Sequence, residues 1–434
     1  MSFLVRLFAI AVAVCLLCLG QADTGYNTNQ RILKIRELGK RGASAIPALA
    51  EYLTDPDSGI RLEAVKAIVR IDTEQSIDPL VQATHDKDDE IQIRATDGLV
   101  NAYLPGYVVK SGLTSSLTRG VRQVKTYFSS RNDQVVGPGV TIRPEVAEAL
   151  KEEIASGSST DARANAARAA GILRDGAAAP ALVQALHSRD NQIIIECLIA
   201  LQKIRDQSAG PGVSFLTRDL DERVQITALE TVGVLRSVPS APDVRSALKL
   251  ARNVRVQRAA LEALAMLGIP EDRPTFQKYA DDSDVGVRVA ALEGLGRIRE
   301  PEDTPVLQKA FDEPNVDWRI HLAAAFALVD EGKLDDSDFA PLPYLLEALN
   351  TRTRANTAAA YLTELARRDD VVKVLAKLAP QASKDEKQAL CPILASSSSP
   401  SVIPVLTELS HDIDPDVALA ASNALRIVKA RGSA

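Results

Sequence analysis

Residues 55–71, DPDSGIRLEAVKAIVRI, carry the pattern that decides the fold. Acidic and turn-forming residues come first, and apolar residues at helical spacing follow them. An aspartate just before such a stretch is a typical N-terminal cap of a helix. Related stretches are DERVQITALETVGVL at 221–235 and DPDVALAASNALRIV at 414–428. The chain therefore repeats one helix-forming unit, and repetition of this kind determines the whole architecture.

A six-residue block inside this unit recurs along the chain. It begins at residues 63, 94, 165, 196, 227, 259, 290, 323, 357, 388 and 420, so the step is 31 to 34 residues with one exception of 71. The second place of the block is alanine in every case except one, where it is Cys197. A small side chain is needed where two helices approach closely. We therefore interpret Cys197 as a packing substitute for alanine and not as a nucleophile.

A series of prolines supports the same register. These are Pro47, Pro79, Pro144, Pro180, Pro211, Pro242, Pro274, Pro305, Pro343 and Pro404. Proline is favoured in the first turn of a helix, where its missing N–H needs no partner. Each repeat is expected to hold a helix A near the proline, an acidic turn, and a helix B with the alanine block. One such pair cannot bury its own apolar face, so stacked neighbours must bury it.

These motifs resemble the HEAT-repeat family, in its short bacterial form that also occurs in phycobilisome-lyase-like repeats. The resemblance covers residues 31–104 and 144–430. It implies an all-α fold, a right-handed α–α superhelix or solenoid of about eleven helix pairs. Arrays that look like this are mostly scaffolds, and a minority are enzymes, so the resemblance specifies the fold far better than the function.

The first residues have the pattern of an export signal. Arg6 precedes an apolar run at 7–19, and Ala22 is a small residue suited to a cut before Asp23. The run is short for a membrane span, which needs ~20 apolar residues. We expect a signal peptide at 1–22 and export to the periplasm or cell envelope of a bacterium. The alternative is retention of the segment as an N-terminal membrane anchor.

The step of 71 residues marks an insertion at 105–143. It separates the N-terminal cap and first repeats at 23–104 from the main array at 144–434. The insertion is basic, although the net charge of the whole chain is −6. Its apolar residues recur at helical spacing, and three basic residues lie largely off that face. The apolar residues are Leu113, Leu117, Val121, Val124 and Phe128, and the basic ones are Arg119, Arg122 and Lys125.

Two interpretations of this amphipathic segment stay open. Its apolar face would pack against the neighbouring repeats, as the apolar stripe of a helix usually does. Alternatively, the segment would dock on anionic membrane lipid or in the groove of a partner protein. Both hold if the apolar face packs and the basic face stays exposed.

The fourth place of the block is expected to lie on helix B away from the alanine. Three consecutive repeats have glutamate there, at Glu230, Glu262 and Glu293. Neighbouring repeats stack at ~10 Å, so these like charges reinforce one field. They predict an acidic strip on the inner surface that suits a basic peptide or protein. The alternative is that they are solvated surface charges without a role.

The sequence offers no motif for catalysis. The patterns HExxH, GxSxG and GxxxxGK[ST] are absent. Asp317, Trp318 and Arg319 are similar to inner-face residues of HEAT-like DNA glycosylases, but they open a helix B, where an aromatic ring usually packs. We predict no catalytic, cofactor-binding or metal-binding residues, and neither a nucleic acid nor a small-molecule ligand.

The function predicted from the sequence is that of a non-enzymatic scaffold or adaptor. It would bind a protein or peptide on the concave face formed by the B helices. One alternative is a phycobilin-lyase-like or other HEAT-repeat enzyme. Another is a peripheral membrane-associated assembly factor that uses the basic insertion at 105–143.

Overall fold

The computed structural model describes residues 27–108, 134–137 and 139–432. Within these ranges the chain forms α- and 3-10 helices joined by turns and short loops, without strands. The expected signal peptide at 1–22 and the basic residues Arg119, Arg122 and Lys125 lie outside the described residues. None of the described helices is long and apolar enough to cross a membrane. The chain divides into two compact units between Val213 and Ser214.

Unit 1 begins with a helical stretch at 27–39, in which Ile35 is fully buried. Alternating A and B helices follow it. They are η1 (Gly42–Ala45), α2 (Ile46–Ala50), η2 (Glu51–Thr54), α3 (Ser58–Ile71), η3 (Glu74–Ser76), α4 (Ile77–Ala83), α5 (Asp89–Tyr103), α7 (Pro144–Ser156), α8 (Thr160–Leu173), η5 (Gly176–Ala178), α9 (Ala179–Ala185) and α10 (Asn191–Ile204). The 3-10 helix η6 (Gln207–Arg218) comes next in the sequence.

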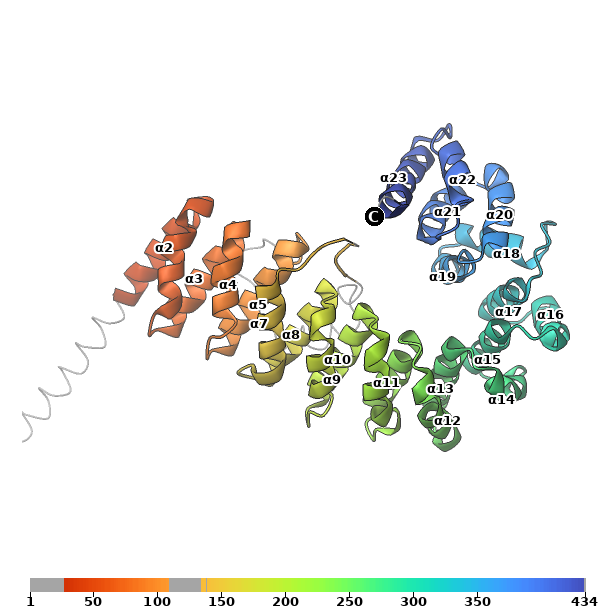
Figure 1. The fold of residues 1–434 in the computed structure, drawn as a ribbon, viewed down its shortest axis with the longest axis horizontal. Coiled ribbons are helices and arrows are strands. Elements are labelled where there is room, and N and C mark those ends of the chain that lie inside the picture. Colours follow the sequence, from red (N-terminus) through yellow and green to blue (C-terminus); the bar gives the residue numbers. More distant parts are fainter. Residues whose placement is uncertain (1–26, 109–133, 138, 433–434) are drawn as a thin grey trace, which may run out of the picture. The chain divides into compact units, whose positions relative to one another are not determined.

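Unit 2 continues the same alternation. Its helices are α11 (Glu222–Val234), η7 (Val238–Ser240), α12 (Ala241–Leu250), α13 (Val254–Leu267), η8 (Pro270–Asp272), α14 (Arg273–Tyr279), α15 (Val285–Ile298), η9 (Pro301–Asp303), α16 (Thr304–Asp312), α17 (Trp318–Glu331), α18 (Pro341–Glu347), η10 (Ala348–Asn350), α19 (Ala355–Leu365), α20 (Asp369–Leu378), η11 (Ala379–Gln381), α21 (Lys384–Ser396), α22 (Val402–Leu409) and α23 (Pro415–Gly432). In Figure 1 the B helices α13, α15 and α17 line the inside of this unit, and α12, α14 and α16 lie outside them.

The alanine ladder forms the contact between successive B helices, as predicted. Ten second-place residues are fully buried, namely Ala64, Ala95, Ala166, Cys197, Ala228, Ala260, Ala291, Ala324, Ala358 and Ala421. The exception is Ala389, which is half-buried, while Cys391 two residues later is fully buried. The helices approach so closely that a Cβ added at Gly296 would lie 2.5 Å from the Cα of Ala327.

The interpretation of Cys197 as a packing residue is confirmed. Its side chain is fully buried, and this burial raises the pKa of the thiol to about 12. A thiol is nucleophilic as the thiolate, which this environment disfavours. The small sulfur-containing side chain therefore fills the place that alanine occupies in the other repeats.

The caps and first turns of the helices also follow the sequence pattern. The carboxylate of Asp57 accepts a hydrogen bond from the Gly59 N–H at 2.8 Å, and the carboxylate of Asp284 accepts one from Val287 at 3.0 Å. Pro144 occupies the first position of α7. Pro211 is the exception among the prolines, because it lies inside the 3-10 helix η6 and does not start an α-helix.

Candidate binding face

The structure places the three predicted glutamates on successive B helices of unit 2. Glu230 lies on α11 and is exposed, while Glu262 on α13 and Glu293 on α15 are half-buried. Burial raises the pKa of Glu262 to about 7, and the negative charges of Glu293 and Glu230 add to this effect, which Arg258 opposes. The three carboxylates are therefore close enough to act on one another, as the acidic strip requires.

Two of these carboxylates, Glu230 and Glu262, make no hydrogen bond or ion pair within the described residues, although the positive charge of Arg258 acts on Glu262. Although Glu230 is exposed as a residue, the surrounding protein still partly desolvates its carboxylate and raises its pKa. A carboxylate that has lost part of its water without gaining a donor is destabilised in its charged form. A cationic group that approaches this surface would restore the lost interaction.

Glu293 differs, because the protein itself occupies both of its oxygens. The hydroxyl of Tyr361 donates to Oε1 at 2.5 Å, and Nη1 of Arg297 donates to Oε2 at 2.9 Å. Burial raises the pKa of Tyr361 well above its usual value, and the neighbouring Glu293 raises it further. Tyr361 belongs to α19, so α15 contacts a B helix two repeats away. The strip available to a ligand is thus limited to Glu230 and Glu262.

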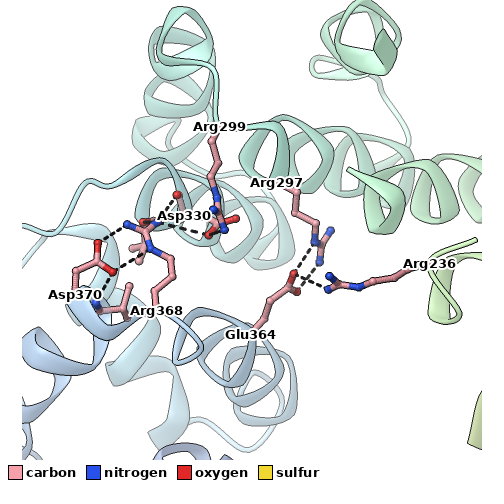
Figure 2. A network of polar contacts seen from close by, with 9 residues as sticks. Arg236, Arg297, Arg299, Asp330, Glu364, Arg368 and Asp370 are labelled. Carbon is pink, nitrogen blue, oxygen red and sulfur yellow. Dashed lines mark hydrogen bonds and ion pairs between the residues drawn. The ribbon is translucent and has the colours of Figure 1, made fainter. Parts of the chain in front are cut away.

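Arg297 also binds a second carboxylate on α19. Its Nε and Nη2 atoms donate to Oε1 and Oε2 of Glu364 at 3.0 and 2.9 Å. The Nη2 atom of Arg236, just after α11, lies 3.8 Å from Oε1 of the same carboxylate. Figure 2 shows the two arginines approaching Glu364 from different elements. Burial alone would raise the pKa of Glu364, but Arg297 and Arg236 bring it below the usual value.

Aromatic packing fills the inner side of unit 2 beside this network. The rings of Phe326 and Tyr361 stack with centroids 4.7 Å apart, and the guanidinium of Arg297 lies 4.9 Å from the centroid of Phe326. Phe326 and Cys391 occupy fourth places of the block, yet both are fully buried. The expectation that every fourth place lies away from the core is therefore wrong for these two repeats, and in the first of them Tyr361 of the next B helix, α19, packs against Phe326.

A second ion-pair cluster joins α15, α17 and α20. Asp330 is 4% exposed, and its Oδ1 accepts from Nη2 of Arg299 at 2.9 Å and lies 3.6 Å from Nη1 of Arg368. Arg368 also pairs with Asp370, as Figure 2 shows. Each charge in this cluster has an opposite partner within the protein. The cluster therefore offers no unpaired charge to a ligand.

Asp317, Trp318 and Arg319 lie at the start of a helix B, as predicted. Trp318 starts α17, and Asp317 caps that helix by accepting a hydrogen bond from the Arg319 N–H at 3.0 Å. The Arg319 side chain pairs with the same carboxylate and lowers the pKa of Asp317 to about 2. Across the described ranges, no group of three or more His, Cys, Asp and Glu side chains is arranged to hold a metal ion.

A sequence signal explains which inner charges are compensated. In unit 1, the fourth-place Arg168 pairs with Glu196, and Asp97 accepts a hydrogen bond from Asn165. Both partners are the first residue of the next block. The corresponding residues after Glu230 and Glu262 are Ala259 and Ala290, which carry no polar group. An alanine at the next first place thus means only that the next block supplies no partner, because Glu293, which is followed by Ala323, is occupied by Tyr361 and Arg297.

The family model described as HEAT repeats matches residues 21–100 and 241–329, in agreement with the repeats in these two segments. No curated protein matches the chain. An engineered protein of known structure is 19% identical over 88% of this chain and 98% of its own, with a TM-score of 0.38. The CpcE–CpcF complex of phycocyanin lyase from Nostoc is 19% identical over 67% and 97%, with a TM-score of 0.36. Kap121p bound to Pho4p is 13% identical over 90% and 44%, with a TM-score of 0.38.

Proposed function

We propose that the chain is a non-enzymatic scaffold that binds a basic segment of a protein or peptide, a role supported by the match of residues 21–100 and 241–329 to HEAT repeats. The binding face is the inner side of unit 2 at α11 and α13. Stacked repeats expose long continuous surfaces, and such surfaces commonly recognise extended partners. The proposal includes export to a bacterial envelope by the segment at 1–22.

The observation that carries this proposal is the state of Glu230 and Glu262. Their carboxylates lie on neighbouring B helices, make no hydrogen bond or ion pair among the described residues, and have raised pKa values. Lysine or arginine of a partner would supply the missing positive charge, and an ammonium or guanidinium group bound to a carboxylate forms a strong, charge-assisted hydrogen bond. Electrostatic complementarity of this kind favours both association rate and specificity.

The test is binding of a short oligolysine peptide, measured by calorimetry at low salt. We expect the E230K/E262K variant to lose about ten-fold or more in affinity, since each substitution replaces an attraction by a repulsion. The matched control is E347K, which makes the same charge change at an exposed glutamate on the outer helix α18. Equal affinity of the wild type and the double variant would contradict the proposal, as would an equal loss in E347K.

The native partner can be sought with the same variants. Pull-downs from the cell envelope would use the wild type, E230K/E262K and E347K as baits. The native partner should be retained by the wild type and by E347K and lost from E230K/E262K. N-terminal sequencing of the mature protein tests export, and the expected first residue is Asp23. A mature chain that starts at Met1 in the cytoplasmic fraction would rule out the cleaved signal.

A further inference from the structure

Arg258 lies on α13, one helical turn before Glu262, and its side chain crosses to the next repeat. Its Nη2 atom donates hydrogen bonds to Oδ1 and Oδ2 of Asp284 at 3.1 and 3.4 Å. Asp284 caps α15, where its Oδ1 also accepts a hydrogen bond from the Val287 N–H at 3.0 Å. The guanidinium of Arg258 is therefore held at the start of α15, whereas Glu262 makes no ion pair among the described residues.

This docked position of Arg258, against Asp284, depends on a glycine. A Cβ added at Gly286 would lie 1.9 Å from Nε and 2.3 Å from Cζ of Arg258, so any side chain at Gly286 would displace the guanidinium. The corresponding place lies seven residues before the fourth place of the block. In the neighbouring B helices it is filled by long side chains, those of Arg223, Arg255 and Arg319. The first turn of α15 therefore leaves room for Arg258 that these helices do not leave.

Arg258 is only partly satisfied in the docked position. Its Nε atom is buried and has no hydrogen-bond partner among the described residues. A buried donor without a partner costs free energy. The ion pair is also partly exposed, since 39% of the Arg258 side chain and 31% of the Asp284 side chain are accessible to solvent. Ion pairs of this kind contribute little to stability and are screened by salt, so the arginine can leave this position.

Glu262 is the carboxylate of the acidic strip that a released Arg258 can reach on its own helix. Residues four apart on a helix are neighbours on its surface, and opposite charges at this spacing attract. The positive charge of Arg258 already acts on Glu262, against the negative charges of Glu230 on α11 and Glu293 on α15. Glu293 has Arg297 as its own partner. Glu262 is therefore the member of the strip with which Arg258 would pair.

We propose that Arg258 is a built-in competitor of the basic partner, and that Asp284 and the space at Gly286 hold it away from Glu262. In the docked position of Arg258, a lysine or arginine of the partner finds the carboxylate of Glu262 open. When Arg258 leaves that position, it pairs with Glu262 and takes the place of the partner's cation. The role as competitor rests on the proposed function, whereas the exchange of Arg258 between two carboxylates is a property of the free protein.

The pKa of Glu262 in the free, full-length protein shows which carboxylate Arg258 binds. Carbon NMR of isotope-labelled glutamate measures this pKa, and the spectrum of E262Q identifies the signal. G286A displaces the guanidinium without changing any charge, and alanine suits a helix better than glycine does. The pKa of Glu262 should then fall by about 0.2–0.7, the change that an exposed ion pair produces. If G286A leaves this pKa unchanged, the exchange is overturned.

D284N removes the charge that holds Arg258 and keeps the cap of α15, because asparagine caps a helix as well as aspartate does. It should also lower the pKa of Glu262, and most of this fall should disappear when R258Q is added. R258Q alone should raise the pKa, since a positive charge near the carboxylate is lost. The matched control is R255Q on the same helix, where Arg255 pairs with Glu222 at 3.1 Å, and it should leave the pKa of Glu262 unchanged. The exchange is overturned if R258Q has no effect, or if D284N lowers the pKa equally with and without R258Q.

The second measurement is the affinity of the oligolysine peptide for the same variants at low salt. G286A and D284N should bind it about two- to five-fold more weakly than the wild type, and R258Q more tightly by a similar factor, because an exposed ion pair contributes little. The differences should vanish at high salt. The expected pKa values together with equal affinities overturn the role of Arg258 as a competitor. If none of the proteins binds the peptide while the pKa of Glu262 still changes as expected, the proposed function fails and the exchange of Arg258 stands.

Discussion

Unit 1 and the beginning of unit 2 use the same place on helix B in opposite ways. In unit 1, Arg168 donates to both carboxylate oxygens of Glu196, at 2.6 and 3.2 Å. In unit 2, Glu230 and Glu262 occupy the corresponding place without any described partner. The backbone and the alanine packing are the same in both cases. The first residue of the next block supplies the partner in unit 1, whereas alanine at that place in unit 2 supplies none.

The largest effect on stability should follow from removing the ion pair between Arg168 and Glu196 in unit 1. The substitution R168M would leave Glu196, which is 7% exposed, without its counter-ion. We expect the free energy of unfolding to fall by about 2–3 kcal/mol, because a buried charge without a partner is strongly destabilising. Urea denaturation measures this, with R205M as the control at an exposed arginine. If R168M and R205M unfold at the same urea concentration, the compensation in unit 1 has no structural role.

Glu153 is a buried carboxyl without a positively charged partner, in a place that a ligand cannot reach. It is 3% exposed on α7, and Thr96 donates to its Oε2 at 2.5 Å. Burial raises its pKa from 4.5 to about 8. The native state thus keeps a proton that the unfolded chain has released, and this lowers the wild-type free energy of unfolding as the pH rises from about 4.5 to about 8.

The substitution E153Q removes this titration and keeps the acceptor for Thr96. We expect it to raise the free energy of unfolding by about 1–3 kcal/mol at pH 8, and by little at pH 4. Urea denaturation at the two pH values gives the comparison. A gain in stability of the same size at both values would mean that ionisation of Glu153 is not the cause.

The acidic strip should show a smaller effect of pH on binding. The pKa of Glu262 is about 7, raised by burial and by Glu293 and Glu230, and opposed by Arg258. Its ionised fraction rises from about one tenth at pH 6 to about nine tenths at pH 8. The affinity for oligolysine should therefore increase several-fold over this interval. E262Q should remove most of the increase, and calorimetry at both pH values will show whether it does.

The smallest effect is expected for C197A. Cys197 is fully buried in the place that alanine fills in other repeats. Removing one sulfur from this position should change the free energy of unfolding by about 1 kcal/mol or less. A loss of several kcal/mol in the free energy of unfolding would show that cysteine and alanine are not equivalent at this place of the repeat.

Most of the fold was accessible from the sequence, because local signals and packing agree in each repeat. Alanine at the helix contact, aspartate at the cap and proline in the first turn all specify the same helix pair. Residues 388–391 are the exception, where Leu390 and Cys391 shift the buried position away from Ala389. The position of a small residue in the block does not determine whether Ala389 or Cys391 is the buried one, because both are small and lie near each other on one helix.

The candidate site was predictable only in part. The acidic positions follow from the repeat register, and the missing counter-charge follows from Ala259 and Ala290. The occupation of Glu293 follows only in part, because Arg297 stands four residues later on the same helix, whereas Tyr361 lies on α19. The contacts of Tyr361 with Glu293 and of Arg297 with Glu364 join residues 68 and 67 positions apart, and no local pattern encodes them.

Each unit has one described cysteine, and the reactivity of its thiol measures how often that part of the unit opens. Cys197 lies in unit 1 and Cys391 in unit 2, and both thiols are shielded from solvent in the folded chain. A small alkylating reagent can modify either one only when its surroundings transiently separate. Mass spectrometry of the two tryptic peptides over time would therefore yield separate opening rates for the two units in a single sample.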